Sequence, residues 1–128
     1  MTRELPPLHE PVIRVVAMPA DTNPHGDIFG GWLMSQMDLA AGNAATRHAS
    51  GRTATVAVEG MSFLGPVTVG DEVSVYADVV RTGRTSMTIA VESWRRPRES
   101  SVMSKVTQAN FTFVAIDVEH RPRAIVAS

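Results

Sequence analysis

The sequence predicts an α+β domain in which an antiparallel β-sheet curves around one long central helix. From Ile28 onward the chain has no proline for more than thirty residues, and the first part of this stretch is mostly Leu, Met, Gln and Ala, which favour a helix. Segments of alternating apolar residues follow, joined by short turn-rich links that favour antiparallel neighbours. One helix cannot cover both faces of a sheet, so we expect one face to be solvated.

The same patterns predict five strands and two loosely ordered tails within one domain. Residues 1–10 contain Pro6 and Pro7 and are expected to form a loosely ordered tail, as are residues 124–128. The whole chain, 1–128, has the length of one domain with a single core. An open sheet has edges to protect, and pairing with a second copy of the chain is one solution. The predicted strands are 12–18, 53–64, 72–80, 86–95 and 105–116.

The predicted helix runs from near Ile28 or Phe29 to His48. Asp27 is expected as its N-cap, since a side-chain oxygen at that position can accept from the first free amides. Residues 50–51, a serine and a glycine, are expected to end it, because glycine is a usual helix terminator.

Apolar side chains lie on every side of this helix, which is typical of a buried helix. Asp38 nevertheless lies in its middle, and an ionised carboxylate is costly to bury without a partner. We therefore expect either a neutralising partner or a cleft at Asp38. Gly42 costs about 1 kcal/mol against alanine in a helix interior, which predicts close packing there. The apolar residues are Trp32, Leu33, Met34, Met37, Leu39 and Ala40.

Composition excludes several classes of protein. A formal charge of −1 disfavours a nucleic-acid protein dominated by phosphate contacts. The absence of cysteine excludes disulfides and thiolate chemistry. No apolar run approaches the roughly 18 residues that span a bilayer, and the N-terminus lacks the apolar segment of a secretion signal, so a cytoplasmic location is expected. The four histidines are scattered along the chain, so no metal site is expected.

Several motifs resemble one enzyme family. The stretches MPADTNPHGDIFGGWLMSQMD, TVAVEGMSFLGPVTVGD, GRTS and ANFTFVAID are similar to hotdog-fold acyl-CoA thioesterases, in particular the YciA-like acyl-CoA hydrolases. The resemblance covers about residues 15–124. It implies a hotdog fold, a five-stranded antiparallel sheet wrapped round the helix. It also implies homodimers with shared active sites, commonly assembled as trimers of dimers (a homohexamer). The implied substrate is acyl-CoA, with no further cofactor.

The resemblance also implies roles for individual residues. Asp38 matches the catalytic aspartate of the central helix, and Asn23 matches its partner in the preceding loop. Gly30 and Gly31 match the pair whose backbone amides bind the thioester carbonyl. The family usually has a second asparagine before the next glycine, where this chain has His25. We treat His25 as a candidate substrate contact.

Within one chain, the Asp38 carboxylate and the glycine amides at the helix N-terminus are expected to lie far apart. Asp38 lies about 12 Å from Gly30 along the helix axis, at 1.5 Å per residue. A carboxylate can act as general base or nucleophile, and helix N-terminal amides can stabilise an oxyanion. We therefore predict a composite site, with Asp38 from one protomer and the amides and Asn23 from its partner. The spacing of Ser35, Asp38 and His48 does not suit a Ser/His/Asp triad.

Coenzyme A carries phosphates, and basic side chains predict where these bind. We expect a cationic patch at one end of the sheet, where guanidinium groups can hold phosphates. Glu59, an acid in an apolar strand, is a secondary candidate at the dimer seam. Met34, Met37, Met61 and Met87 are expected in the core, with some lining the acyl channel. The predicted patch consists of Arg84, Thr85, Ser86, Arg95, Arg96, Arg98 and Lys105.

Two other functions stay open at this point. The DTNPHGD stretch also resembles the aspartate, asparagine-proline and histidine element of hotdog enoyl-CoA hydratases, in which His25 would act. A non-catalytic acyl-CoA-binding protein would share the fold and the pocket. Hydration of crotonyl-CoA, or tight binding without turnover, would distinguish these from a hydrolase.

Overall fold

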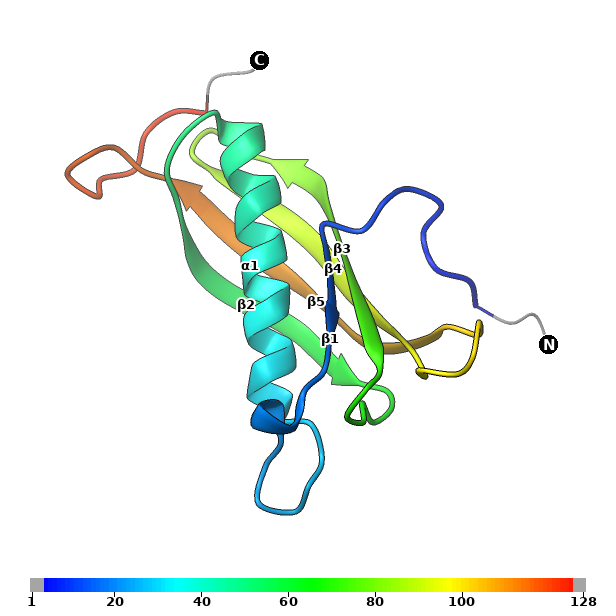
Figure 1. Cartoon of the computed structure of the whole chain (residues 1–128). Coiled ribbons are helices and arrows are strands. Elements are labelled where there is room, and N and C mark those ends of the chain that lie inside the picture. The colour runs from blue at the N-terminus through cyan, green and yellow to red at the C-terminus, as the bar shows by residue number, and fades with distance from the viewer. Residues whose placement is uncertain (1–3, 126–128) are drawn as a thin grey trace.

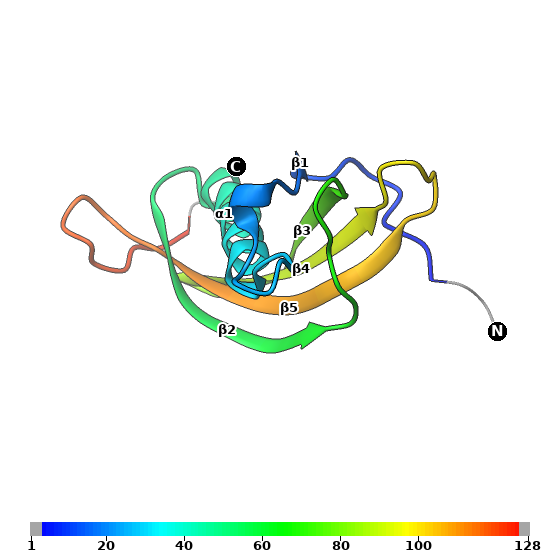
Figure 2. The ribbon, with the colours of Figure 1, turned by 60° about the horizontal axis from the view of Figure 1, so that its bottom comes forward.

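The computed structural model describes residues 4–125 and forms a single sheet around one helix. Strands are arranged in the order β1-β3-β4-β5-β2, and every neighbouring pair is antiparallel. The sheet curves so that helix α1 lies on its concave side (Figures 1 and 2). This is the predicted α+β architecture. The elements are β1 (Ile13–Val16), the 3-10 turn η1 (Pro19–Asp21), α1 (Gly30–Ala49), β2 (Thr53–Phe63), β3 (Glu72–Thr82), β4 (Ser86–Arg96) and β5 (Ser104–Ala115).

The start of α1 differs from the prediction. Its N-cap is Phe29, which makes no side-chain capping bond, so the expectation of Asp27 as N-cap is wrong. The backbone carbonyl of Asp27 instead accepts from the amide of Asn23 at 2.7 Å, within the preceding loop. Two residues of loop backbone therefore separate Asp27 from the helix. At the other end Ser50, with φ of 52°, terminates the helix as predicted.

Only one side of α1 is buried. Its side chains facing the sheet form the core with the inner faces of β3, β4 and β5, whereas Met34 and Leu39 on the opposite side are 40% and 62% exposed. The prediction of a helix buried all round is therefore wrong for the single chain, because one sheet layer covers one helix face. The buried helix residues are Leu33, Met37, Ala40, Ala41, Ala45 and Ala49.

The methionines and Gly42 also refine the prediction. Met37 and Met87 are fully buried core residues, and Met61 packs against the core. A Cβ placed on Gly42 would lie 3.6 Å from the ring of Phe113, which is ordinary contact. Close packing therefore does not require glycine at position 42, contrary to the expectation.

A chain of buried hydroxyl groups joins α1 to the sheet. Thr107 Oγ1 donates to Met37 Sδ at 3.1 Å, and Ser93 Oγ hydrogen-bonds to the Thr107 hydroxyl. Since Thr107 uses its only hydrogen on Met37, Ser93 must donate to Thr107. All three residues are fully buried. The chain ties the residue before Asp38 to the floor of the core.

The chain ends contact the sheet more closely than predicted. Glu4 pairs with Lys105 at 3.0 Å, and His9 Nε2 lies 3.1 Å from Asp78 Oδ2. At the other end the amide of Ile125 donates to the carbonyl of a residue in the β3–β4 turn at 2.8 Å. The described parts of the two predicted loose tails are thus held in place. Residues 1–3 and 126–128 of those tails lie outside the described residues.

Candidate active site

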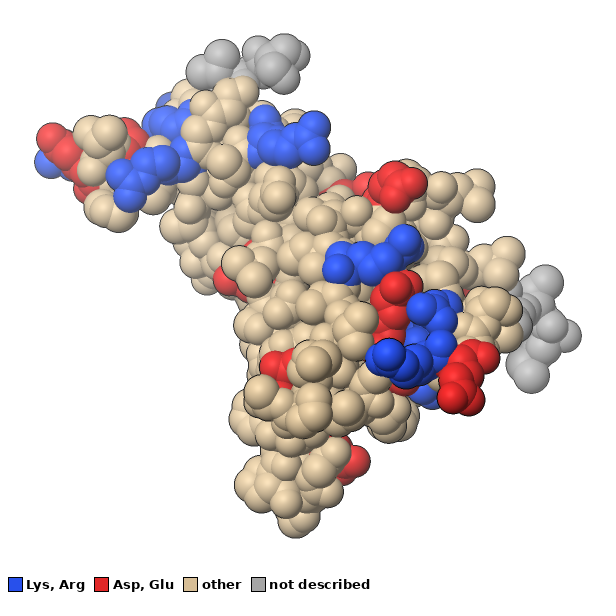
Figure 3. Space-filling view, in the orientation of Figure 1, with Lys and Arg blue, Asp and Glu red and all other residues tan. Residues whose placement is uncertain are grey.

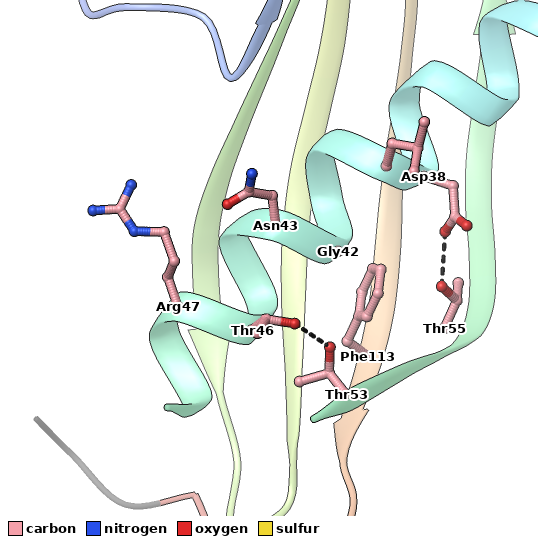
Figure 4. Close-up of a pocket in the computed structure, with 9 residues that line it drawn as sticks. Asp38, Gly42, Asn43, Thr46, Arg47, Thr53, Thr55 and Phe113 are labelled. Carbon is pink, nitrogen blue, oxygen red and sulfur yellow. Dashed lines mark hydrogen bonds between the residues drawn. The ribbon is translucent and has the colours of Figure 1, made fainter. Parts of the chain in front are cut away.

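Asp38 lies on the exposed side of α1, directly after the buried Met37. The hydroxyl of Thr55 on β2 donates to its Oδ1 at 2.7 Å (Figure 4). Asp38 forms no ion pair within residues 4–125. The carboxylate is therefore oriented by one hydroxyl, and no basic side chain of the described chain neutralises it.

A groove of about 480 Å³ opens beside Asp38, between α1 and β2. Asp38, Gly42 and Thr46 face it at four-residue spacing, which places them on one side of a helix. The Thr46 hydroxyl lies 3.1 Å from that of Thr53 on β2, as Figure 4 shows. The expected cleft at Asp38 is present. Its lining residues are Asp38, Leu39, Gly42, Asn43, Thr46, Arg47, Thr53, Thr55 and Phe113.

The helix N-terminus presents free amides. The Phe29 carbonyl accepts from Trp32 at 3.0 Å and from Leu33 at 3.3 Å, so the amides of Gly30 and Gly31 precede the first helical hydrogen bonds. No acceptor for either amide exists among residues 4–125, and both glycines are exposed. Any side chain at Gly31 would place its Cβ 2.8 Å from the Phe29 ring. Glycine therefore keeps this terminus open.

Asn23 closes the loop before the helix. Its Oδ1 accepts from the amides of His25 at 2.9 Å and Asp27 at 3.1 Å, which is an Asx turn. The side-chain NH₂ group forms no hydrogen bond within the described residues. The turn leaves this group available as a donor, while the His25 side chain is exposed on the loop.

One chain does not bring Asp38 and the glycine amides together. Seven residues separate Asp38 from Gly31, which is about 10 Å along the axis, and seven residues make almost two full turns. The carboxylate and the amides therefore lie on nearly the same side of α1 but too far apart to contact one reacting atom.

The predicted phosphate-binding residues fall into two groups. Arg84 and Thr85 lie in the β3–β4 turn and Ser86 begins β4, whereas Arg95 and Arg96 lie at the opposite end of β4. The expectation of one cationic patch at one sheet end is therefore wrong within the chain. Sequence position could not show this, because β4 carries the two groups to opposite ends.

The arginines of the second group form ion pairs with acidic side chains. Arg95 lies 3.4 Å from the buried Asp71, and Arg96 lies 3.5 Å from Glu72. Lys105, opposite Trp94 in the β4–β5 pair, is close to this group as predicted.

Lys105 itself lies between two carboxylates, 3.0 Å from Glu4 and 3.4 Å from Glu92. Burial lowers the pKa of Lys105, but the hydrogen bond to Glu4 and the charge of Glu92 outweigh it and raise the pKa above its usual value. Its positive charge is therefore largely compensated inside the chain.

Glu59 lies on the edge strand β2, opposite Asn110 and beside an irregularity of the β2–β5 pairing. Its side chain is exposed, and Gly60 beyond it has a φ of 66°. The structure places Glu59 at an open sheet edge and not in the Asp38 groove.

Six of the groove residues were not singled out from the sequence: Asn43, Thr46, Arg47, Thr53, Thr55 and Phe113. Asn43 and Arg47 could have been found from their four-residue spacing after Leu39. Thr55 could not, because its position beside Asp38 depends on how β2 packs against α1.

Residues 4–125 contain neither a metal-binding cluster nor a membrane-spanning helix. No group of three or more His, Asp or Glu side chains is placed to hold a metal ion. No helix in this part of the chain is long and apolar enough to cross a membrane.

Comparisons of sequence and of structure both match this chain to thioesterases. The family described as "Thioesterase superfamily" matches residues 25–102. An uncharacterized acyl-CoA thioester hydrolase of Zymomonas mobilis is 55% identical over 92% of this chain and 79% of its own length. The acyl-CoA thioester hydrolase YciA of Escherichia coli is 52% identical over 89% of each chain. A hexameric thioesterase from Yersinia pestis superposes with a TM-score of 0.90, at 48% identity over 95% of this chain and 99% of the other.

Proposed function

We propose, because this chain belongs to the thioesterase superfamily, that it is an acyl-CoA thioesterase, hydrolysing acyl-CoA to a free fatty acid and coenzyme A. The predicted family and hotdog fold are both confirmed. The observation that carries the mechanism is Asp38, an exposed carboxylate in a groove, oriented by Thr55 and without an ion-pair partner in the described chain.

Asp38 begins the reaction in this mechanism. As general base, its carboxylate takes a proton from water while the water oxygen attacks the thioester carbonyl carbon. The carbonyl electron pair moves onto oxygen, the C–S bond then breaks, and the coenzyme A thiolate takes up the proton. In the alternative route the carboxylate itself attacks, the C–S bond breaks and the coenzyme A thiolate leaves. Water then hydrolyses the resulting mixed anhydride to the free fatty acid and restores Asp38. In both routes Thr55 fixes the direction in which one carboxylate oxygen points.

Gly30 and Gly31 supply the oxyanion donors. Their amides lie at the N-terminus of a long helix, where the dipole adds to the favourable field for a developing negative charge. Asn23, whose NH₂ group is free within the described chain, is placed in the loop beside this terminus as a further donor. His25 is a substrate contact of that loop.

The complete site requires two protomers. Asp38 comes from one protomer, and Gly30, Gly31 and Asn23 come from its partner. Within one chain even Gly31, the nearer of the two glycines, lies about 10 Å from Asp38 along the helix axis. Met34 and Leu39 on α1 are exposed apolar side chains, as are Val56, Val58 and Phe63 on the edge strand β2, and a second copy would cover them. The Yersinia pestis relative is hexameric. We propose a homohexamer of this chain, a trimer of such dimers, with Glu59 near the seam between β2 edges.

The phosphates of coenzyme A are assigned to the β3–β4 turn. Arg84 is exposed there and has no carboxylate partner among residues 4–125, and Thr85 and Ser86 add hydroxyl donors. The other predicted group, Arg95, Arg96 and Lys105, already faces acids and is a weaker candidate. No cofactor takes part, and a cytoplasmic location is the accompanying proposal.

The test is thiol release from octanoyl-CoA by wild type and Asp38→Asn. Asparagine keeps the shape of the side chain but cannot accept the proton, so kcat should fall about 1,000-fold. Asp78→Asn, an exposed aspartate on the other sheet face, serves as the matched control and should retain wild-type rate. Full activity of Asp38→Asn would remove this carboxylate from the mechanism.

The two alternative functions have their own tests. Hydration of crotonyl-CoA that is lost in His25→Ala would point to a hydratase. Binding of acyl-CoA without turnover would point to a non-catalytic protein.

A further inference from the structure

The Asp38 groove continues along α1 for two turns beyond the carboxylate. Leu39, Asn43 and Arg47 form a second row along it at four-residue spacing. Along this row the lining changes from apolar at Leu39 to an amide at Asn43 and a guanidinium at Arg47. Figure 4 shows the side chains of Asn43 and Arg47. Arg47 lies about 13 Å from Asp38 along the helix axis, at 1.5 Å per residue. The groove is therefore long and becomes cationic at its far end.

Arg47 has no partner side chain among residues 4–125 that would give it a structural role. Its side chain is exposed, and it forms neither an ion pair nor a side-chain hydrogen bond within residues 4–125. Glu10 is the acid that shares a neighbouring hollow with Arg47 and Asn43, yet it does not pair with Arg47. Basic side chains gather at the end of the molecule where α1 ends (Figure 3). This end is thus available to an anion from outside the chain.

Gly42 keeps the middle of the groove open. It lies in the helix interior, where glycine is less favourable than alanine, and a Cβ there would meet Phe113 only at ordinary contact distance, 3.6 Å. Packing does not explain the glycine. Room between Asp38 and Arg47 does, because any larger side chain at this position would project into the groove.

We propose that Arg47 and Asn43 form a recognition subsite for an anionic group of the substrate. The inference rests on the proposed function, since Asp38 marks where the thioester lies. A guanidinium can hold a carboxylate or a phosphate through two hydrogen bonds. The anion is either the terminal carboxylate of an ω-carboxyacyl chain or a phosphate of coenzyme A other than those held at the β3–β4 turn, since coenzyme A carries both a diphosphate and a separate 3′-phosphate.

The test measures binding of non-hydrolysable thioethers by calorimetry, so that it does not depend on turnover. The probes are S-octyl-CoA, S-(7-carboxyheptyl)-CoA and S-octyl-pantetheine, which lacks the nucleotide phosphates. Arg47→Gln removes the charge, and Arg52→Gln, an exposed arginine outside the groove, is the matched control. Unchanged melting temperature and oligomeric state would show that both variants fold.

Each outcome decides the inference. A loss of about 10-fold in affinity in Arg47→Gln, confined to the carboxyheptyl probe, supports it with the acyl carboxylate as the anion. An equal loss for both CoA probes and none for the pantetheine probe supports it with the phosphate. Unchanged affinity for all three probes, failure of all three to bind wild type, or an equal loss in Arg52→Gln would overturn it. Absence of hydrolysis by a wild type that binds the probes would refute only the proposed function.

Discussion

Replacing Thr55 by valine tests whether this hydroxyl orients the catalytic carboxylate. Valine has the same shape but cannot donate to Asp38 Oδ1, so one hydrogen bond of 2.7 Å is lost. A bond to a charged group contributes about 1.5–3 kcal/mol when buried. Both residues are exposed in the single chain, so water replaces the donor and the stability loss should stay below about 1 kcal/mol.

Activity should respond far more strongly than stability. Without the hydroxyl the carboxylate of Asp38 can rotate away from the reacting water, and a misplacement of about 1 Å can cost on the order of 100-fold in rate. We therefore expect kcat for octanoyl-CoA to fall about 10- to 100-fold in Thr55→Val, with a smaller change in KM.

The assay combines thiol release with urea denaturation of the same samples. Thr55→Ser keeps the donor and should recover most of the rate, and Thr112→Val, which alternates with the buried Phe111 and Phe113 and so faces the other side of the sheet, should match wild type. Wild-type kcat in Thr55→Val would refute the orienting role. A large loss of stability with a proportional loss of rate would show a structural role instead.

Two further predictions follow from the buried hydroxyls and from the divided site. Thr107→Val should lower the free energy of unfolding by about 1–3 kcal/mol, because it leaves the Ser93 hydroxyl buried without an acceptor. In urea denaturation, the double variant Thr107→Val/Ser93→Ala should lose less stability than the sum of the two single variants. Strictly additive losses would contradict this coupling. Co-refolding equal amounts of Asp38→Asn and Gly31→Val, each inactive alone, should restore about one quarter of wild-type thiol release, since random pairing makes half of the dimers mixed and each mixed dimer has one intact site. No recovery from mixed dimers would place the whole site within one protomer.

The sequence predicted those features that depend on local pattern. Strand β3 was placed from the alternation of Val73, Val75 and Val79, and its predicted and observed starts agree at Glu72. The helix end at Ser50 followed from local turn chemistry in the same way. Asp38 stood out because a charge interrupts an apolar helix.

Features that depend on distant contacts could not be predicted. Asp27 has the chemistry of an N-cap, but its backbone bond to Asn23 places it inside a closed loop. Thr55 reaches Asp38 only because β2, after leaving the helix end, returns along α1. To predict that the basic residues form two separate groups, one would have needed the pairing order of the strands.

The adjacency of Met37 and Asp38 restricts how this family can change in length. Met37 is locked into the core by Thr107, while Asp38 faces the groove, and each residue advances the helix by about 100°. A single inserted or deleted residue between Gly30 and Met37 would break the phase between the amide-bearing terminus and the reactive acid, however well the helix itself tolerated it. Insertions and deletions among relatives should therefore accumulate in the loops and at the chain ends, and spare this one segment.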